Sequence, residues 1–163
     1  MEVTDFNTLS VEDATTLLAG CLGVPRWVDE LVTGRPYESG PALRARAHDA
    51  ARRLTDEELD AALSRHPRIG EVPQSALGAD EARSSRSEQA GVADADAQRL
   101  REANAAYEAR FGRVFLVRAA GRSSAEILAE AERRLTNDEA REREETVTAL
   151  RDIALLRLAR AVS

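Results

Sequence analysis

Residues 94–111, DADAQRLREANAAYEARF, place small and apolar side chains at intervals of three and four residues. This spacing is typical of an amphipathic helix with one buried face. The positions on that face are Ala97, Leu100, Ala103, Asn104, Tyr107 and Phe111. Asp94 can cap the N-terminus of this helix, and Gly112 is a natural C-terminal stop. We therefore predict a long helix packed against a core.

The next apolar stretch, Val114 to Val117, is the only one in the chain with the composition of a strand. A single strand has no partner with which to form a sheet. We therefore expect one short, extended, buried segment near residues 114–117.

Helix signals continue through the rest of the chain. Capping residues mark the starts of four further helices, at Ser10 with Asp13, Thr55 with Glu58, Ser123 with Glu126, and Asn137. Pro25 suits the first turn of a short helix that carries Trp27. An apolar stripe runs through Leu43, Ala47, Ala50, Ala51 and Leu54, and a short helix is predicted over residues 82–90. The helix after Thr55 should stop at Arg65, because a residue that precedes proline is pushed away from helical angles.

The composition agrees with this all-α interpretation. The chain has 163 residues, enough for one domain of ordinary size with a core of its own. Aromatic residues make up only 4% of it, whereas Ala, Leu, Glu and Arg are abundant. These four favour helices over strands. We predict a compact, multi-helix single domain over residues 1–163.

Charge and hydropathy narrow the range of partners. The 29 acidic side chains outnumber the 23 basic ones, for a formal charge of -6. No basic stripe is free of interleaved acids, which argues against nucleic acid as a partner. No apolar run has the length needed to cross a bilayer, and Met1–Asp5 does not begin a signal peptide. We expect a cytoplasmic protein that binds neither nucleic acid nor membranes.

Two residue types limit the possible chemistry. All basic residues are arginine, so Schiff-base catalysis, pyridoxal phosphate anchoring and a Walker-type lysine are excluded. The single cysteine, Cys21, rules out an internal disulfide and a cysteine-rich zinc site. Cys21 follows apolar positions of a predicted helix, so we interpret it as a small buried hydrophobe rather than a nucleophile.

The two histidines differ in context. His48 lies at the edge of its helical stripe and is predicted to be a surface or boundary residue. His66 begins the stretch HPRIG, directly after a predicted helix. The partial negative charge at a helix C-terminus favours a protonated imidazole and suits acid–base work near neutral pH. A structural role for a loop histidine before proline remains an alternative.

Two further groups could bind a ligand. In SRSEQAG, residues 85–91, Ser85 and Glu88 share a helical face and Gln89 lies beside it. These groups suit a small, hydrogen-bond-rich ligand such as a ureide, although a solvated, capped helix would have a similar composition. Arg157 lies on a largely apolar face of the last helix. It either extends to water or meets a carboxylate.

In their order and spacing, these residues resemble the OHCU decarboxylase family over nearly the whole chain. The matching pieces are Phe6-Asn7, Trp27, Arg35-Pro36-Tyr37, residues 66–70, 85–91, 104–107, 111–117 and 120–123, Arg134-Leu135 with Asn137, and Ile153 with Arg157-Leu158. OHCU is 2-oxo-4-hydroxy-4-carboxy-5-ureidoimidazoline. The resemblance implies its decarboxylation to (S)-allantoin in urate degradation, by an all-α homodimer that uses no metal or organic cofactor.

The resemblance also implies roles for individual residues. His66 takes the place of the catalytic histidine and Glu88 that of its partner acid. Side chains that would help to hold the substrate are Ser85, Gln89 and Arg157, and the pocket would be lined by Pro67 and the backbone around Leu116, Val117 and Ala119. Val114 stands where the family pattern has proline, and the stretch after Gly91 is short. Both departures concern loop geometry more than chemistry.

Two other interpretations remain open at this point. A metal hydrolase could use His66, His48, Glu71 and Glu88, but the histidines lack the paired helical spacing of such sites. A non-catalytic helical protein, binding a ureide or serving as an adaptor, would fit the alternating Arg and Glu of the last two helices. Such charge runs are usually solvated helix faces.

Overall fold

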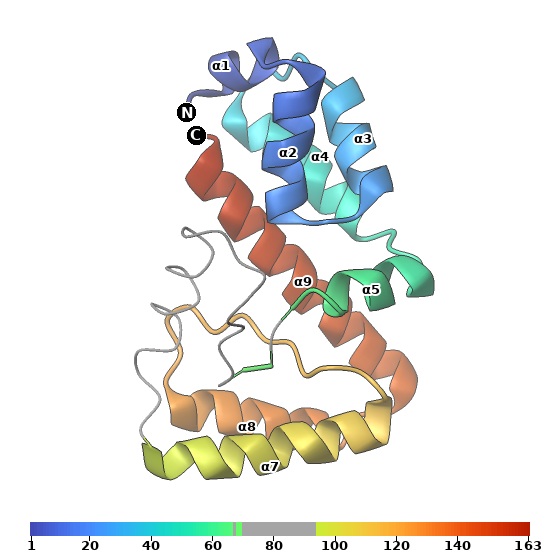
Figure 1. Ribbon diagram of the computed structural model, residues 1–163, viewed down its shortest axis with the longest axis vertical. Coiled ribbons are helices and arrows are strands. Elements are labelled where there is room, and N and C mark those ends of the chain that lie inside the picture. The colour runs from blue at the N-terminus through green and yellow to red at the C-terminus, as the bar shows by residue number, and fades with distance from the viewer. Residues whose placement is uncertain (67, 70–93) are drawn as a thin grey trace. The chain divides into compact units, whose positions relative to one another are not determined.

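The computed structural model describes residues 1–66, 68–69 and 94–163 (Figure 1). Within these ranges every regular element is an α-helix, so the predicted fold class is confirmed. The helices are α1 (Val3–Thr8), α2 (Val11–Cys21), α3 (Pro25–Thr33), α4 (Gly40–Ala51), α5 (Asp56–Leu63), α7 (Asp94–Phe111), α8 (Ser124–Arg134) and α9 (Glu139–Ala161). The short helix predicted over residues 82–90 lies outside the described residues.

The chain divides into two compact units. The terminal unit comprises Met1–Ala62 and Val147–Ser163, and the central unit comprises Leu63–Thr146. Helix α9 begins in the central unit and continues into the terminal unit. The single domain expected over residues 1–163 stays a prediction.

The terminal unit packs around Trp27. The indole is fully buried on α3, which packs against α2 and α4. Its Nε1 donates a hydrogen bond to the carbonyl oxygen of Ala47 at 2.9 Å, so the polar end of the ring is satisfied inside the core. All five positions of the predicted stripe on and after α4 are buried: Leu43, Ala47, Ala50, Ala51 and Leu54.

Most of the predicted helix starts are confirmed. The Ser10 side chain accepts a hydrogen bond from the Asp13 amide at 3.0 Å. Thr55 and Glu58 exchange the two hydrogen bonds of a capping box, and Ser123 and Glu126 form another. Pro25 occupies the first turn of α3. These starts were predictable because each rests on local hydrogen bonds between residues three apart.

Other predicted boundaries were wrong. Asn137 does not cap the last helix, because Asp138 accepts the hydrogen bond from the Arg141 amide, at 2.8 Å. The helix expected to stop at Arg65 ends at Leu63, and the His66 amide donates to the Leu63 carbonyl at 3.0 Å. Helix α1 was missed. Its start has no side-chain cap, and two of its six residues, Val3 and Phe6, are buried in the core.

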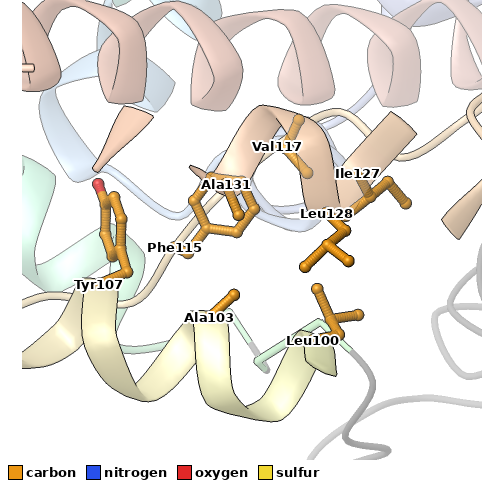
Figure 2. Close-up of a cluster of buried hydrophobic side chains, with 8 residues drawn as sticks. All are labelled: Leu100, Ala103, Tyr107, Phe115, Val117, Ile127, Leu128 and Ala131. Carbon is orange, nitrogen blue, oxygen red and sulfur yellow. The ribbon is translucent and has the colours of Figure 1, made fainter. Parts of the chain in front are cut away.

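The core of the central unit lies between α7, α8 and the segment between them (Figure 2). Its buried members are Leu100, Ala103, Tyr107, Phe115, Val117, Ile127, Leu128 and Ala131. Helix α7 ends as predicted, since Gly112 has a φ of +68° and its amide bonds to the Glu108 carbonyl at 2.8 Å. The segment 114–117 is extended and irregular with Phe115, Leu116 and Val117 buried, which confirms that prediction.

Candidate active site

His66 lies just after α5, in the turn closed by its own amide. Its side chain is half-buried. His66 therefore follows the C-terminal end of α5, where the last carbonyl groups of a helix carry partial negative charge. The predicted position of His66 at a helix C-terminus is therefore confirmed.

The chain that follows His66 is attached to α7 at two consecutive residues. The Arg68 guanidinium makes a two-pronged contact with the Glu108 carboxylate, with Nη2 to Oε2 at 2.8 Å. This hydrogen bonding lowers the pKa of the Glu108 carboxyl group. The Asn104 side-chain amide donates to the Ile69 carbonyl oxygen at 3.0 Å. Asn104 and Glu108 are one helical turn apart, so a single face of α7 holds both residues.

A pocket of about 240 Å³ adjoins these two attachments. Its lining residues are Arg68, Ile69, Arg101, Asn104, Ala105 and Glu108. Asn104 is 5% exposed, and its Oδ1 has no hydrogen-bond partner within the described residues. A buried amide oxygen in this state is a vacant acceptor. The wall of the pocket therefore combines a charged pair, an arginine and one buried amide.

The second predicted wall, around Leu116 to Ala119, is fixed by Arg134. The guanidinium Nη1 of this α8 residue donates to the Leu116 carbonyl at 2.5 Å. The side chains of Leu116 and Val117 are buried, and Ala119 is half-buried. The Leu116 carbonyl accepts a hydrogen bond from Arg134 and its side chain is buried. Leu116 therefore supports this segment from the protein interior.

Both walls rest on the same core. Ile69, three residues after His66, packs against the central cluster that includes Val117, and so does Ala119. The structure thus places the chain after His66 and the segment 116–119 against one set of buried side chains. That both line one substrate pocket stays a prediction.

Arg134 is itself part of a buried polar cluster that the sequence analysis missed. Its guanidinium is paired with Glu142, with Nε to Oε1 at 2.8 Å, and also donates to Thr146. The Tyr107 hydroxyl donates to the same carboxylate oxygen, and the Asn137 amide donates to the other at 2.9 Å. Burial, reinforced by Glu142, raises the pKa of Tyr107 and keeps it a neutral donor.

The sequence located Arg134 and Tyr107 but did not reveal their roles. Arg134 and Tyr107 both fall in the stretches that carry the family resemblance. Their roles were not visible in the sequence, because the partner carboxylate lies eight residues beyond Arg134 on another helix. An arginine in the last turn of a helix is more often a solvated partner of the helix dipole.

The remaining predicted site residues are not brought together by the described structure. Pro67, Ser85, Glu88 and Gln89 lie outside the described residues. Arg157 belongs to α9 in the terminal unit and is half-buried. The contacts of His66 with Glu88, and of Arg157 with any substrate, stay predictions.

The positive charge of Arg157 acts on the pKa of the Cys21 thiol. Burial raises the pKa of the Cys21 thiol to about 11, and the positive charge of Arg157 acts in the opposite direction. Cys21 is 5% exposed and its thiol faces the Leu17 carbonyl at 3.5 Å. The interpretation of Cys21 as a buried hydrophobe is confirmed.

His48 is half-buried at the edge of α4, as predicted, with its Nδ1 3.2 Å from a carboxylate oxygen of Asp49. No group of three His, Cys, Asp or Glu side chains converges within the described ranges. Glu71 and Glu88 of the metal-hydrolase alternative lie outside those ranges.

The family-like residues of the terminal unit hold that unit together. The Asn7 amide and the Tyr37 backbone exchange two hydrogen bonds, each of 2.8 Å. Arg35 donates to the carbonyl oxygens of Phe6 and Leu9 at 3.1 and 2.8 Å. These contacts join residues about thirty apart in the sequence, which gives the motifs a structural role.

Across the parts of the chain that the structure describes, no helix combines the length and hydropathy needed to cross a bilayer.

Three comparisons with known proteins give consistent matches. A family model described as OHCU decarboxylase matches residues 7–159. The chain is 31% identical over 121 residues to the uric acid degradation bifunctional protein TTL of Arabidopsis thaliana. That alignment covers 72% of this chain and 37% of the plant protein, so the chain spans little more than a third of the length of this relative.

Two solved structures share the fold. A crystal structure of OHCU decarboxylase in the presence of (S)-allantoin matches with a TM-score of 0.74 and 26% identity, over 88% of this chain and 94% of that chain. A crystal structure of (S)-allantoin synthase matches with a TM-score of 0.74 and 17% identity, over 99% of this chain and 54% of that chain. The second likeness concerns the fold alone.

Proposed function

The chain belongs to the OHCU decarboxylase family, and we propose that it converts OHCU to (S)-allantoin and carbon dioxide. The observation that carries this proposal is the family match over residues 7–159, which includes the HPRIG segment and the helix to which it is attached. A solved OHCU decarboxylase of which 94% aligns with this chain supports it. The substrate class is a small ureide.

The reaction has chemistry that side chains alone can promote. The bond between the ring carbon and the carboxylate breaks, carbon dioxide leaves, and the electron pair stays on the ring. The neighbouring carbonyl and imine of the ring delocalise this pair. Protons are then added to the imine nitrogen and to the ring carbon that carries the ureido group, and the 4-hydroxyl loses its proton to become the carbonyl of the product. Delivery of the proton to a single face of the ureido-bearing carbon sets the configuration of the product. The protein therefore has to orient the carboxylate and control proton delivery.

We assign the proton transfer to His66, oriented by Glu88. The position of His66 in the turn directly after α5 supports this assignment. Gln89 and Ser85 would bind the ureide, and Arg157 the carboxylate, since arginine offers a planar pair of donors for such a group. Pro67, Val117 and Ala119 would line the pocket, with Leu116 supporting that wall from within.

We further propose that the active form is a cytoplasmic homodimer. Light scattering coupled to size-exclusion chromatography would give about twice the chain mass of 17.8 kDa for a dimer. A mass of one chain at enzyme concentrations that retain full activity would overturn this part of the proposal.

Variants of the two proposed acid–base residues test the assignment. OHCU is generated in the cuvette from urate with the two preceding enzymes, and circular dichroism follows the formation of (S)-allantoin. We expect His66→Ala and Glu88→Ala each to lose roughly a hundred- to ten-thousand-fold in rate, the usual contribution of a positioned acid or base. The matched control is His48→Ala, the only other histidine. Near-normal turnover by His66→Ala or Glu88→Ala would refute their roles.

A further inference from the structure

We propose that Asn104 is a positioning residue for His66, acting through the main chain at Ile69. This inference rests on the proposed function, because it assumes that His66 transfers the proton. Only two residues separate His66 from the carbonyl oxygen that Asn104 holds at 3.0 Å. The position of that carbonyl therefore limits where the imidazole can lie.

The burial of Asn104 indicates that its side-chain amide has a specific hydrogen-bonding role. It lies on the inward face of α7 beside Ala103, and it is 5% exposed. Burying an amide without a hydrogen bond costs about 1–3 kcal/mol in mutational data. An apolar residue would avoid that cost, so an asparagine here is best explained by the carbonyl to which it donates. Neighbouring Ala103 fills the same face without such a bond.

The attachment is stiff because it has three contacts on rigid elements. Arg68 is paired with Glu108 one turn further along α7, and the Ile69 side chain packs against the central core. Asn104 holds the main-chain carbonyl of Ile69, directly after these two side-chain contacts. A displacement of a catalytic group by about 1 Å can cost a factor of about one hundred in rate. A loose Ile69 carbonyl would therefore lower the rate through His66.

The chain offers a direct readout of this effect, since it contains only two histidines. In a ¹H–¹³C spectrum the His66 ring signals report on the proposed site, and the His48 signals come from α4 in the terminal unit. The test variant is Asn104→Leu, which keeps the size of the side chain and removes the donor. Its matched control is Gln98→Leu on the exposed part of α7, where the amide bonds only to Glu102 and Arg101 among the contacts seen.

We expect Asn104→Leu to shift or broaden the His66 signals and to leave the His48 signals in place. Gln98→Leu should change neither. With OHCU as substrate, Asn104→Leu should lower kcat by about tenfold or more and change KM less than about threefold, because the groups assigned to substrate binding, Ser85, Gln89 and Arg157, are left in place. A second variant, Asn104→Ala, also lacks the donor and adds no bulk, and it should give the same pattern.

Three results would overturn the inference. Unchanged His66 signals in both Asn104 variants would show that the ring does not depend on this bond. Equal disturbance of both histidines, or failure of both variants to fold, would make Asn104 a general stability residue. A change in KM without a change in kcat would assign it to binding. If the unmodified protein does not convert OHCU at all, the proposed function fails, whereas the spectra still decide whether Asn104 positions His66.

Discussion

Replacing Glu142 by glutamine should destabilise the protein by about 3 kcal/mol. The carboxylate is fully buried and takes hydrogen bonds from Arg134, Tyr107 and Asn137. Removing one partner of a buried ion pair usually costs about 3–5 kcal/mol, because the other charge is left uncompensated. Arg134 is only 1% exposed, but Glu145 lies 4.0 Å from its Nε and can compensate part of the charge. The lower end of that range is therefore expected.

The carboxamide of Glu142→Gln also presents an N–H₂ group where the carboxylate only accepted. That group meets either the Asn137 amide or the donors of Arg134 and Tyr107, so one hydrogen bond becomes a contact between two donors. This mismatch prevents glutamine from acting as a neutral substitute. It supports a cost well above that of an exposed pair.

Urea and thermal unfolding measure the effect. A loss of about 3 kcal/mol corresponds to a fall in Tm of roughly 6–12 °C for a chain of this size. Far-UV circular dichroism follows the helices, and the fluorescence of Trp27 reports on the terminal unit, so coincident transitions would justify a two-state treatment. The control is Glu144→Gln, whose carboxylate is 72% exposed and pairs with Arg141 at 3.7 Å. Exposed pairs contribute about 0–1 kcal/mol. Equal small losses in both variants would refute the reasoning.

Two further predictions concern titration. Hydrogen bonds from Arg133 lower the pKa of Glu145 from 4.5 to about 2, so its contribution to stability is complete above about pH 4.5 and is lost as the pH falls toward 2. Glu145→Gln should therefore narrow the difference in unfolding free energy between pH 7 and pH 3, measured in urea, and an unchanged difference would contradict this. With a pKa of about 11 instead of 9.0, Cys21 has about one hundredth of the usual thiolate at pH 8. Alkylation of the native protein should be at least that much slower than in urea, and comparable rates would contradict the buried assignment.

The sequence predicted the helices whose starts depend on neighbouring residues. Ser10, Thr55 and Ser123 each bond to the residue three positions ahead, and all three caps are present. The final helix shows the limit of this reasoning. Asn137 and Asp138 are both good capping residues. Asp138 is the cap, whereas the Asn137 side chain donates hydrogen bonds to Glu142 and Glu145. That engagement is tertiary and is not visible in the local sequence.

The candidate site was predictable to a similar extent. The position of His66 after a helix could be predicted because Pro67 follows it, and the extended segment 114–117 could be predicted from its composition. Asn104 and Arg134 bind these two segments to the rest of the protein. Both residues belong to the family pattern, but no role was predicted for either. Each donates a hydrogen bond to a main-chain carbonyl oxygen, of Ile69 or of Leu116. Because every residue has such a carbonyl, the sequence does not show which one is the acceptor.

The proposed conversion of OHCU to (S)-allantoin by this chain is tested by measuring the product itself. OHCU is produced from urate in the presence of increasing amounts of the purified protein, and the circular dichroism signal of (S)-allantoin is recorded against the spontaneous background. If the chain catalyses this reaction, the initial rate of the signal rises in proportion to the protein and the final product is a single enantiomer. A rate equal to the spontaneous one, with racemic product at every protein concentration, would contradict it.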